Sequence, residues 1–195
     1  MANLITLQEY KDAENITTTR DDYRIDYLIT AVSKLIKTYC GNSIIDYYTT
    51  PKVETVSVDW DTYCIQLTES PVVSVTAVEE RLSYSSSYST LDIDNEDYFV
   101  DNNLDSVYRT TGAGYKNWPK GPGSVRVTYT AGYDGTPEDL KLAVIDLINY
   151  YLKDEYKERK TLAGASLQNP GSSSQDSSVA FPDHIKRILD LYKNF

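Results

Sequence analysis

The amino-acid sequence predicts an α+β fold, in which a small bundle of about four helices is interrupted by a β-rich insertion of about five or six strands. Hydrophobic residues repeat at intervals of three and four near both ends of the chain, as in amphipathic helices. In the middle they alternate with polar residues, as in strands. A Gly- and Ser-rich stretch near the C-terminus has neither pattern, which predicts a flexible arm.

These changes of period divide the chain into five segments. Residues 1–50 and 136–160 are the two parts of the predicted helical core, and residues 51–135 are the insertion between them. Residues 161–180 are the predicted flexible arm, and residues 181–195 form a C-terminal helix. Helices on both sides of the strands bury their apolar stripes most simply against each other, so the strands are predicted to interrupt one helical unit.

The first helical part contains two predicted helices. Thr6 and Glu9 make a capping box, which predicts a short helix over residues 7–14. A long amphipathic helix is predicted over residues 19–40, and Gly41 supplies its left-handed stop. Spacing of three and four residues defines its core-facing side chains, which are Ile25, Leu28, Ile29, Val32, Leu35 and Ile36.

After Pro51 the period of the hydrophobic residues changes to two, and strands follow. Residues 56–60 and 63–67 are predicted to form a hairpin around a two-residue link. The further predicted strands span residues 72–78, 98–100, 104–109 and 125–131.

The second helical part begins at Thr136-Pro137-Glu138-Asp139, which offers a cap, a proline at the first helical position and acids in the first turn. The helix predicted over residues 136–156 turns four side chains toward the core, namely Leu140, Val144, Leu147 and Ile148. A last helix begins near Pro182 and gathers Ile185, Ile188, Leu189 and Tyr192 on one face. That apolar face is expected to pack against another surface.

The composition excludes several classes of function. With 19 basic and 29 acidic residues the formal charge is -10, which opposes tight binding to nucleic-acid phosphates. The start of the chain has no basic stretch followed by an apolar one, and no window is apolar enough to span a membrane, so a soluble cytoplasmic protein is expected. The two cysteines, Cys40 and Cys64, fit no metal or redox spacing and are expected to be reduced.

The sequence offers little for catalysis. The glycines at 112 and 114 do not lead into a helix, so they make no phosphate-binding loop. The single histidine, His184, has no second histidine or cysteine pair for a metal site, and no serine has a glycine-flanked elbow. The acidic run at residues 92–97 lacks the glycine of a calcium loop and is interpreted as a solvated turn. No catalytic, cofactor-binding or metal-binding residue is predicted, and the chain is not expected to be an enzyme.

Four motifs resemble one known family. They are the opening LITLQEY at residues 4–10, IKTYCGN at 36–42, SPVVSV at 70–75, and VTYTAGY at 127–133 running into TPEDL at 136–140. Together these motifs resemble the head–tail connector, or adaptor, proteins of tailed phages. In that family the strand, the Ala-Gly-Tyr turn and the Pro-Glu-Asp-Leu helix start occur in this order.

The resemblance implies a structural subunit of the virion neck. Connectors of this kind form a ring, typically of twelve copies, that lies beneath the portal protein, extends the DNA channel and meets other neck or tail proteins. Genomic DNA would pass through without specific binding, which suits an acidic lining. The resemblance also implies portal or ring contacts near the C-terminus, where the candidate residues are Ile185, Ile188, Leu189, Tyr192 and Phe195.

Two alternatives stay open. The chain would also suit another neck protein, such as a tail-completion or stopper subunit, which would contact the tail rather than the portal. From a different class, Trp60, Trp118 and the 18 tyrosines would suit a carbohydrate- or ligand-binding β module, because aromatic faces stack on sugars.

Overall fold

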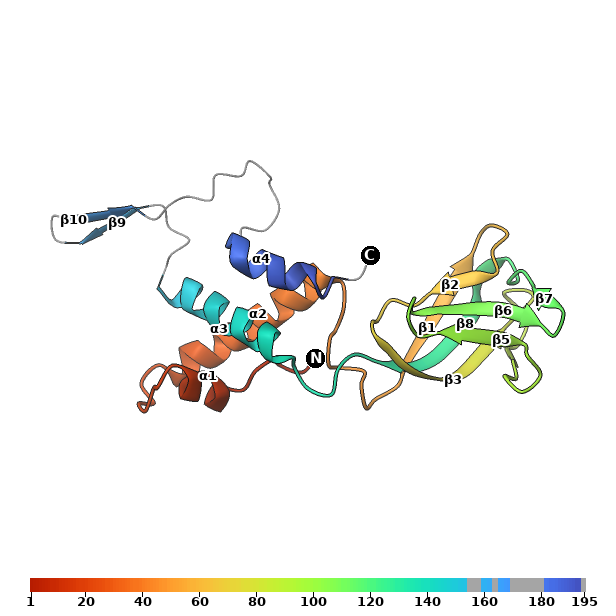
Figure 1. The fold of residues 1–195 in the computed structure, drawn as a ribbon, viewed down its shortest axis with the longest axis horizontal. Helices are drawn as coiled ribbons and strands as arrows, with labels where there is room; N and C mark the ends of the chain where they lie inside the picture. Colours follow the sequence, from red (N-terminus) through yellow and green to blue (C-terminus); the bar gives the residue numbers. More distant parts are fainter. Residues whose placement is uncertain (154–158, 163–164, 169–180, 194–195) are drawn as a thin grey trace. The chain divides into compact units, whose positions relative to one another are not determined.

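The computed structural model describes residues 1–153, 159–162, 165–168 and 181–193, and Figure 1 shows its elements in sequence colours. The chain divides into two compact units. The first, here called the helical unit, joins Met1–Cys40 to Gly135–Lys193, and the second, the strand unit, is Gly41–Asp134. The sequence predicts that residues 41–50 belong with the helices, whereas the structure places them with the strands.

The described residues of the helical unit form four helices, and all four lie where the sequence predicts a helix. They are α1 (Leu7–Ala13), α2 (Asp22–Cys40), α3 (Glu138–Leu152) and α4 (Asp183–Asp190). The predicted capping box of α1 is present, with the Thr6 side chain accepting from the Glu9 backbone N–H and the Glu9 carboxylate accepting from that of Thr6. At α3 the cap position is held by Pro137 without a side-chain hydrogen bond, so the predicted Thr136 cap is wrong by one residue.

The arm predicted at residues 161–180 contains one element that the sequence did not indicate. Strands β9 (Arg159–Leu162) and β10 (Ala165–Gln168) pair antiparallel, with Ala165 opposite Leu162. The rest of the predicted arm, residues 163–164 and 169–180, lies outside the described residues.

The strand unit contains eight strands in two antiparallel sheets, which confirms the predicted α+β class and exceeds the predicted strand count. One sheet has the order β1 (Lys52–Val58), β8 (Gly121–Ala131), β3 (Val72–Glu80), β4 (Ser89–Thr90). The second sheet has the order β2 (Cys64–Gln66), β6 (Ser106–Thr111), β5 (Tyr98–Asp101), and β7 (Gly114–Tyr115) pairs with β6.

The predicted hairpin between the first two strands is wrong. Strand β1 pairs with β8, and β2 pairs with β6 in the other sheet. The long strand β8 explains this result, because its eleven residues pair with β1 on one side and with β3 on the other. Local alternation identified the strands, but it carries no information about which partner each strand takes.

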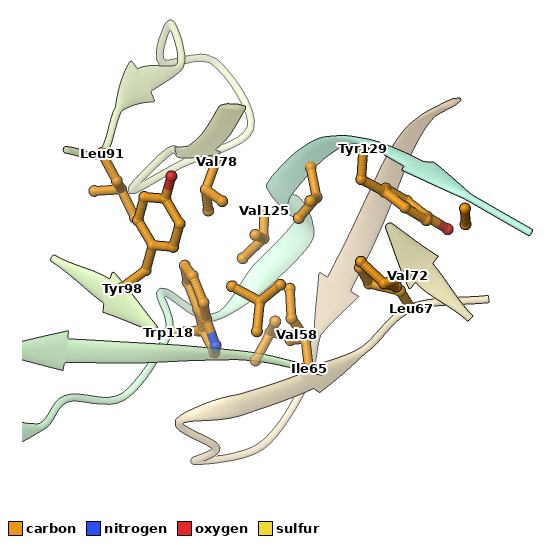
Figure 2. Close-up of a cluster of buried hydrophobic side chains, with 13 residues drawn as sticks. Val58, Ile65, Leu67, Val72, Val78, Leu91, Tyr98, Trp118, Val125 and Tyr129 are labelled. Carbon is orange, nitrogen blue, oxygen red and sulfur yellow. The ribbon is translucent and has the colours of Figure 1, made fainter. Parts of the chain in front are cut away.

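The core of the strand unit is made by side chains from both sheets (Figure 2). Trp118 lies among Val58, Ile65 and Tyr98, and only 2% of its surface is exposed. Val125, Val127 and Tyr129 point inward from β8 at alternate positions, as the period of two requires.

The Ala-Gly-Tyr turn after β8 holds residues 41–50 in the strand unit. The Gly132 N–H donates to the Pro71 carbonyl at 2.8 Å, and the Tyr133 N–H donates to the Ile44 carbonyl at 2.8 Å. Gly132 has φ +97, and a Cβ there would lie 2.2 Å from the Ile44 carbonyl oxygen. Only glycine fits this close approach of two backbones.

Candidate functional site

The predicted core-facing side chains of the helical unit converge. Ile29, Val144 and Leu147 are completely buried where α2 packs on α3. Eight of the ten predicted packing residues are buried, namely Ile25, Ile29, Val32, Ile36, Leu140, Val144, Leu147 and Ile148, while Leu28 and Leu35 are half-buried. The apolar stripes of α2 and α3 therefore bury each other inside one unit.

Helix α4 packs on this core. Ile185 and Leu189 are buried, and α4 packs on both α2 and α3. The Tyr39 hydroxyl donates to Asp190 at 2.6 Å, which is the first cause of a raised pKa of about 12 for Tyr39. The Tyr192 hydroxyl donates to Asp139, also at 2.6 Å. These bonds fix α4 as the last layer of the bundle.

The burial of α4 corrects part of the predicted contact surface. Ile185 and Leu189 face the bundle interior, so their side chains are not available to a portal or ring neighbour. Ile188 and Tyr192 are half-buried, and Phe195 lies outside the described residues. The sequence missed the exposed Leu191, which follows α4 directly.

The strand unit carries a different surface, an aromatic face formed by Tyr63, Phe99, Tyr108 and Tyr115. The pairing register places Phe99 opposite Tyr108, and Tyr63 stacks on Tyr115 with ring centroids 4.7 Å apart. Tyr108 lies 6.2 Å from Tyr63 and 6.3 Å from Phe99, so the four rings are contiguous. Phe99 and Tyr115 are 56% and 68% exposed. Phe99 and Tyr115 therefore contribute exposed aromatic surface to one contiguous patch, the kind of surface at which proteins take partners.

Carboxylates border the aromatic face. Glu96 and Phe99 line the same shallow groove, together with Ile93 and Thr110. Asp101 lies on β5 two positions after Phe99, on the same side of the sheet. A hydrogen bond with Cys64 is the largest cause of a raised pKa of Tyr108, and the negative charge of Asp101 contributes to the same shift.

A buried ion cluster supports the aromatic face from behind. The Arg109 guanidinium donates two bonds to Glu80, at 2.9 and 3.0 Å, and a further bond to the Asp97 carbonyl. Arg109 is on β6 and Glu80 is on β3, so the cluster joins the two sheets. Bidentate geometry and the nearly complete burial of Arg109 make this cluster a rigid base for β6.

Two further observations concern chemistry. Within the described ranges no group of three or more His, Cys, Asp or Glu side chains could hold a metal ion. Cys40 and Cys64 are both free thiols, and burial raises the pKa of Cys40 to about 11, which keeps that thiol protonated near neutral pH.

No helix among the described residues is long and apolar enough to cross a bilayer.

Comparison with known proteins agrees with this arrangement. The model of one protein family, the head completion proteins, matches residues 3–195. The chain belongs to the head completion protein family. The resemblance to phage head–tail connectors that four sequence motifs indicated is thereby confirmed.

One curated relative and several solved structures are similar to this head completion protein. The head completion protein of Escherichia phage T5 is 31% identical over 72 residues, an alignment that spans 36% of this chain and 39% of the T5 protein. A chain in the neck of the empty gene transfer agent particle, computed with C6 symmetry, has a TM-score of 0.61 at 16% identity, over 98% of this chain and 90% of its own length.

A chain in the neck of the native gene transfer agent particle, computed with C12 symmetry, has a TM-score of 0.58 at 17% identity. That alignment covers 100% of this chain and 96% of the other. At these identities the likeness shows a shared fold, and it extends over the helical and strand parts of this head completion protein alike.

Only one of the two tryptophans that suggested a carbohydrate-binding module is accessible to a sugar. Trp118 is buried in the core of the strand unit and cannot stack on a sugar. Trp60 remains 69% exposed, and it lies three residues before Tyr63, which belongs to the aromatic face. The tyrosine count was the one available sign of that face in the sequence, and it did not say which tyrosines gather.

Proposed function

We propose that this head completion protein is a structural connector of a tailed phage, which completes the filled head and joins it to the tail in the virion neck. Membership of the head completion family over residues 3–195 carries this proposal. The folds of two gene transfer agent neck chains support it, because they match this chain over at least 98% of its length.

In this proposal the protein acts as a ring. The related necks were computed with C6 and C12 symmetry, which favours a ring of twelve copies beneath the portal protein. A ring around the channel of the neck would let genomic DNA pass without specific binding. The formal charge of -10 supports this role, since a lining of the same sign as the phosphates does not retain them.

The C-terminal end of the helical unit is the proposed portal-facing region. Ile188, Leu191 and Tyr192 leave apolar surface there after α4 has packed. Lys186 and Arg187 lie on the exposed side of the same helix. A partner would therefore meet a mixed surface rather than the apolar stripe that the sequence suggested.

An add-back experiment tests the function. Heads are purified from infections that lack this gene, incubated with the purified protein, sedimented, and then mixed with tails. The protein is expected to cosediment with the heads and to restore the joining of tails. Heads that join tails equally well without it, or that never retain it, would contradict the proposal. Imaging of the neck then separates a portal-bound ring from a subunit bound on the tail side.

A further inference from the structure

The formal charge is divided unequally between the two units. Residues 41–134 contain 14 acidic and six basic side chains, a formal charge of -8, whereas the remainder of the chain has 15 acidic and 13 basic side chains, a charge of -2. The strand unit therefore carries most of the negative charge of the protein. The aromatic face lies on this unit.

Most of the cationic side chains in the strand unit form ion pairs with carboxylates of the same unit. Lys52 pairs with Glu69 at 3.0 Å, and Arg126 pairs with Glu79 at 2.6 Å. Arg109 is enclosed by Glu80 and Asp97, and Lys120 pairs with Asp61 at 2.8 Å. The excess carboxylates lie on the surface, where residues such as Asp92, Asp94 and Glu96 are exposed. Internal pairing leaves the outside of the unit strongly negative.

Tyrosine rings elsewhere in the strand unit already bind arginine guanidinium groups. The Arg81 guanidinium stacks on the rings of Tyr84 and Tyr88 at 4.9 and 4.8 Å, and Arg126 lies 4.2 Å from the Tyr88 ring. A guanidinium or ammonium over a tyrosine ring is attracted by the negative face of the ring. The rings of Tyr63 and Tyr115 offer such faces without a cation from this chain among the described contacts.

We propose that the aromatic face of Tyr63, Phe99, Tyr108 and Tyr115 docks an Arg- or Lys-bearing surface of another neck or tail protein. This inference rests on the proposed function and specifies one of its partners. Phe99 and Tyr115 anchor the contact by burial and cation–π stacking, while Glu96 and Asp101 pair with cations at the rim.

Charge decides between the possible occupants. The strand unit of a second copy is also charged -8, so two such units repel each other across this face. DNA phosphates and anionic lipid headgroups are repelled for the same reason. A protein surface rich in Arg or Lys is attracted, and it can desolvate the exposed rings at the same time.

Binding to defined partners tests the inference. The probes are the portal ring and each tail-side neck protein of the same virion, purified separately, with affinity measured at about 50 mM and about 500 mM salt. The variant is Phe99→Ala with Tyr115→Ala, and the matched control is Leu82→Ala, an 81% exposed residue of the same unit outside the face. Both variants must keep the wild-type melting temperature.

One of these probes is expected to bind the wild type. The double variant weakens that binding by more than about tenfold and the control by less than about twofold. The Glu96→Gln and Asp101→Asn pair weakens binding at low salt and flattens its salt dependence.

Two results overturn the inference while leaving the proposed function intact. In the first, the double variant binds the same probe as tightly as the wild type. In the second, the double variant loses its ring of copies but still binds every probe, which makes the occupant a second copy. If the wild-type protein binds no probe and restores no head, the proposed function fails together with the inference.

Discussion

Replacing Gly132 with alanine tests the closest backbone approach in the strand unit. The added Cβ would lie 2.2 Å from the Ile44 carbonyl oxygen, well inside the 3.0 Å below which something must shift. That oxygen belongs to a backbone and also accepts the Tyr133 N–H, so it cannot swing aside as a long side chain would. Gly132→Ala therefore forces the segment around Ile44 away from the end of β8.

The expected cost has a conformational and a steric part. Alanine at φ +97 costs about 1–2 kcal/mol, as for other left-handed positions. Displacing the Ile44 backbone adds about 1–3 kcal/mol, as for an over-packed site. Gly135 is the matched control, since its φ is +89 and no atom lies within 4 Å of its added Cβ. Gly135→Ala is expected to show the conformational part alone.

Urea unfolding followed by tryptophan fluorescence reads this difference. Both tryptophans, Trp60 and Trp118, belong to the strand unit, so their emission reports on that unit, while circular dichroism at 222 nm reports mainly on the helices. Gly132→Ala should lower the fluorescence midpoint clearly more than Gly135→Ala lowers either signal. Equal midpoints for the two variants would show that Gly132 does not lie in close contact with the Ile44 backbone.

Three other predictions concern buried groups. Arg109→Ala leaves the Glu80 carboxylate without its bidentate partner and should cost about 3–5 kcal/mol, whereas Lys120→Ala, which removes an exposed pair, should cost less than about 1 kcal/mol in the same urea assay. Ile29→Asp places an unpaired charge in the helical core and should abolish the helical melt, and an unchanged melt would refute the packing. Burial and the hydrogen bond to Glu54 raise the pKa of the Tyr129 hydroxyl. The protonated hydroxyl therefore stabilises the fold fully below the ordinary pKa of 10.0, and this contribution falls as pH rises above that value. Tyr129→Phe should flatten the resulting loss of stability at alkaline pH.

The sequence predicted the helices better than their roles. The stripes on α2 and α3 were assigned to the core because two helices of matching pattern need each other. Ile185 and Leu189 have the same pattern, and the family resemblance predicts contacts with a partner protein for them, because periodicity shows that a face is buried and not which chain buries it. The tertiary bonds of Tyr39 and Tyr192 to Asp190 and Asp139 settle the question for α4, and no sequence pattern indicates them.

The aromatic face illustrates a second limit. Tyr98 and Phe99 are neighbours on β5, and both are large and apolar, so alternation alone does not say which one points inward. Pairing with β6 places Phe99 beside Tyr108, and it leaves Tyr98 in the core. The face therefore depends on a register between strands that were predicted separately, and on β7, which was not predicted.

The charge of the strand unit gives salt two opposite effects. Its carboxylates repel one another in the folded unit, so screening by salt should raise the urea midpoint read by tryptophan fluorescence. Screening also weakens the attraction between Glu96, Asp101 and a cationic partner, so binding at the aromatic face should become weaker over the same range of salt. A loss of fold would make stability and binding fall together. Measuring both on one protein sample therefore separates an electrostatic docking surface from a unit that salt simply unfolds, and a midpoint that falls as salt rises would contradict the charge argument.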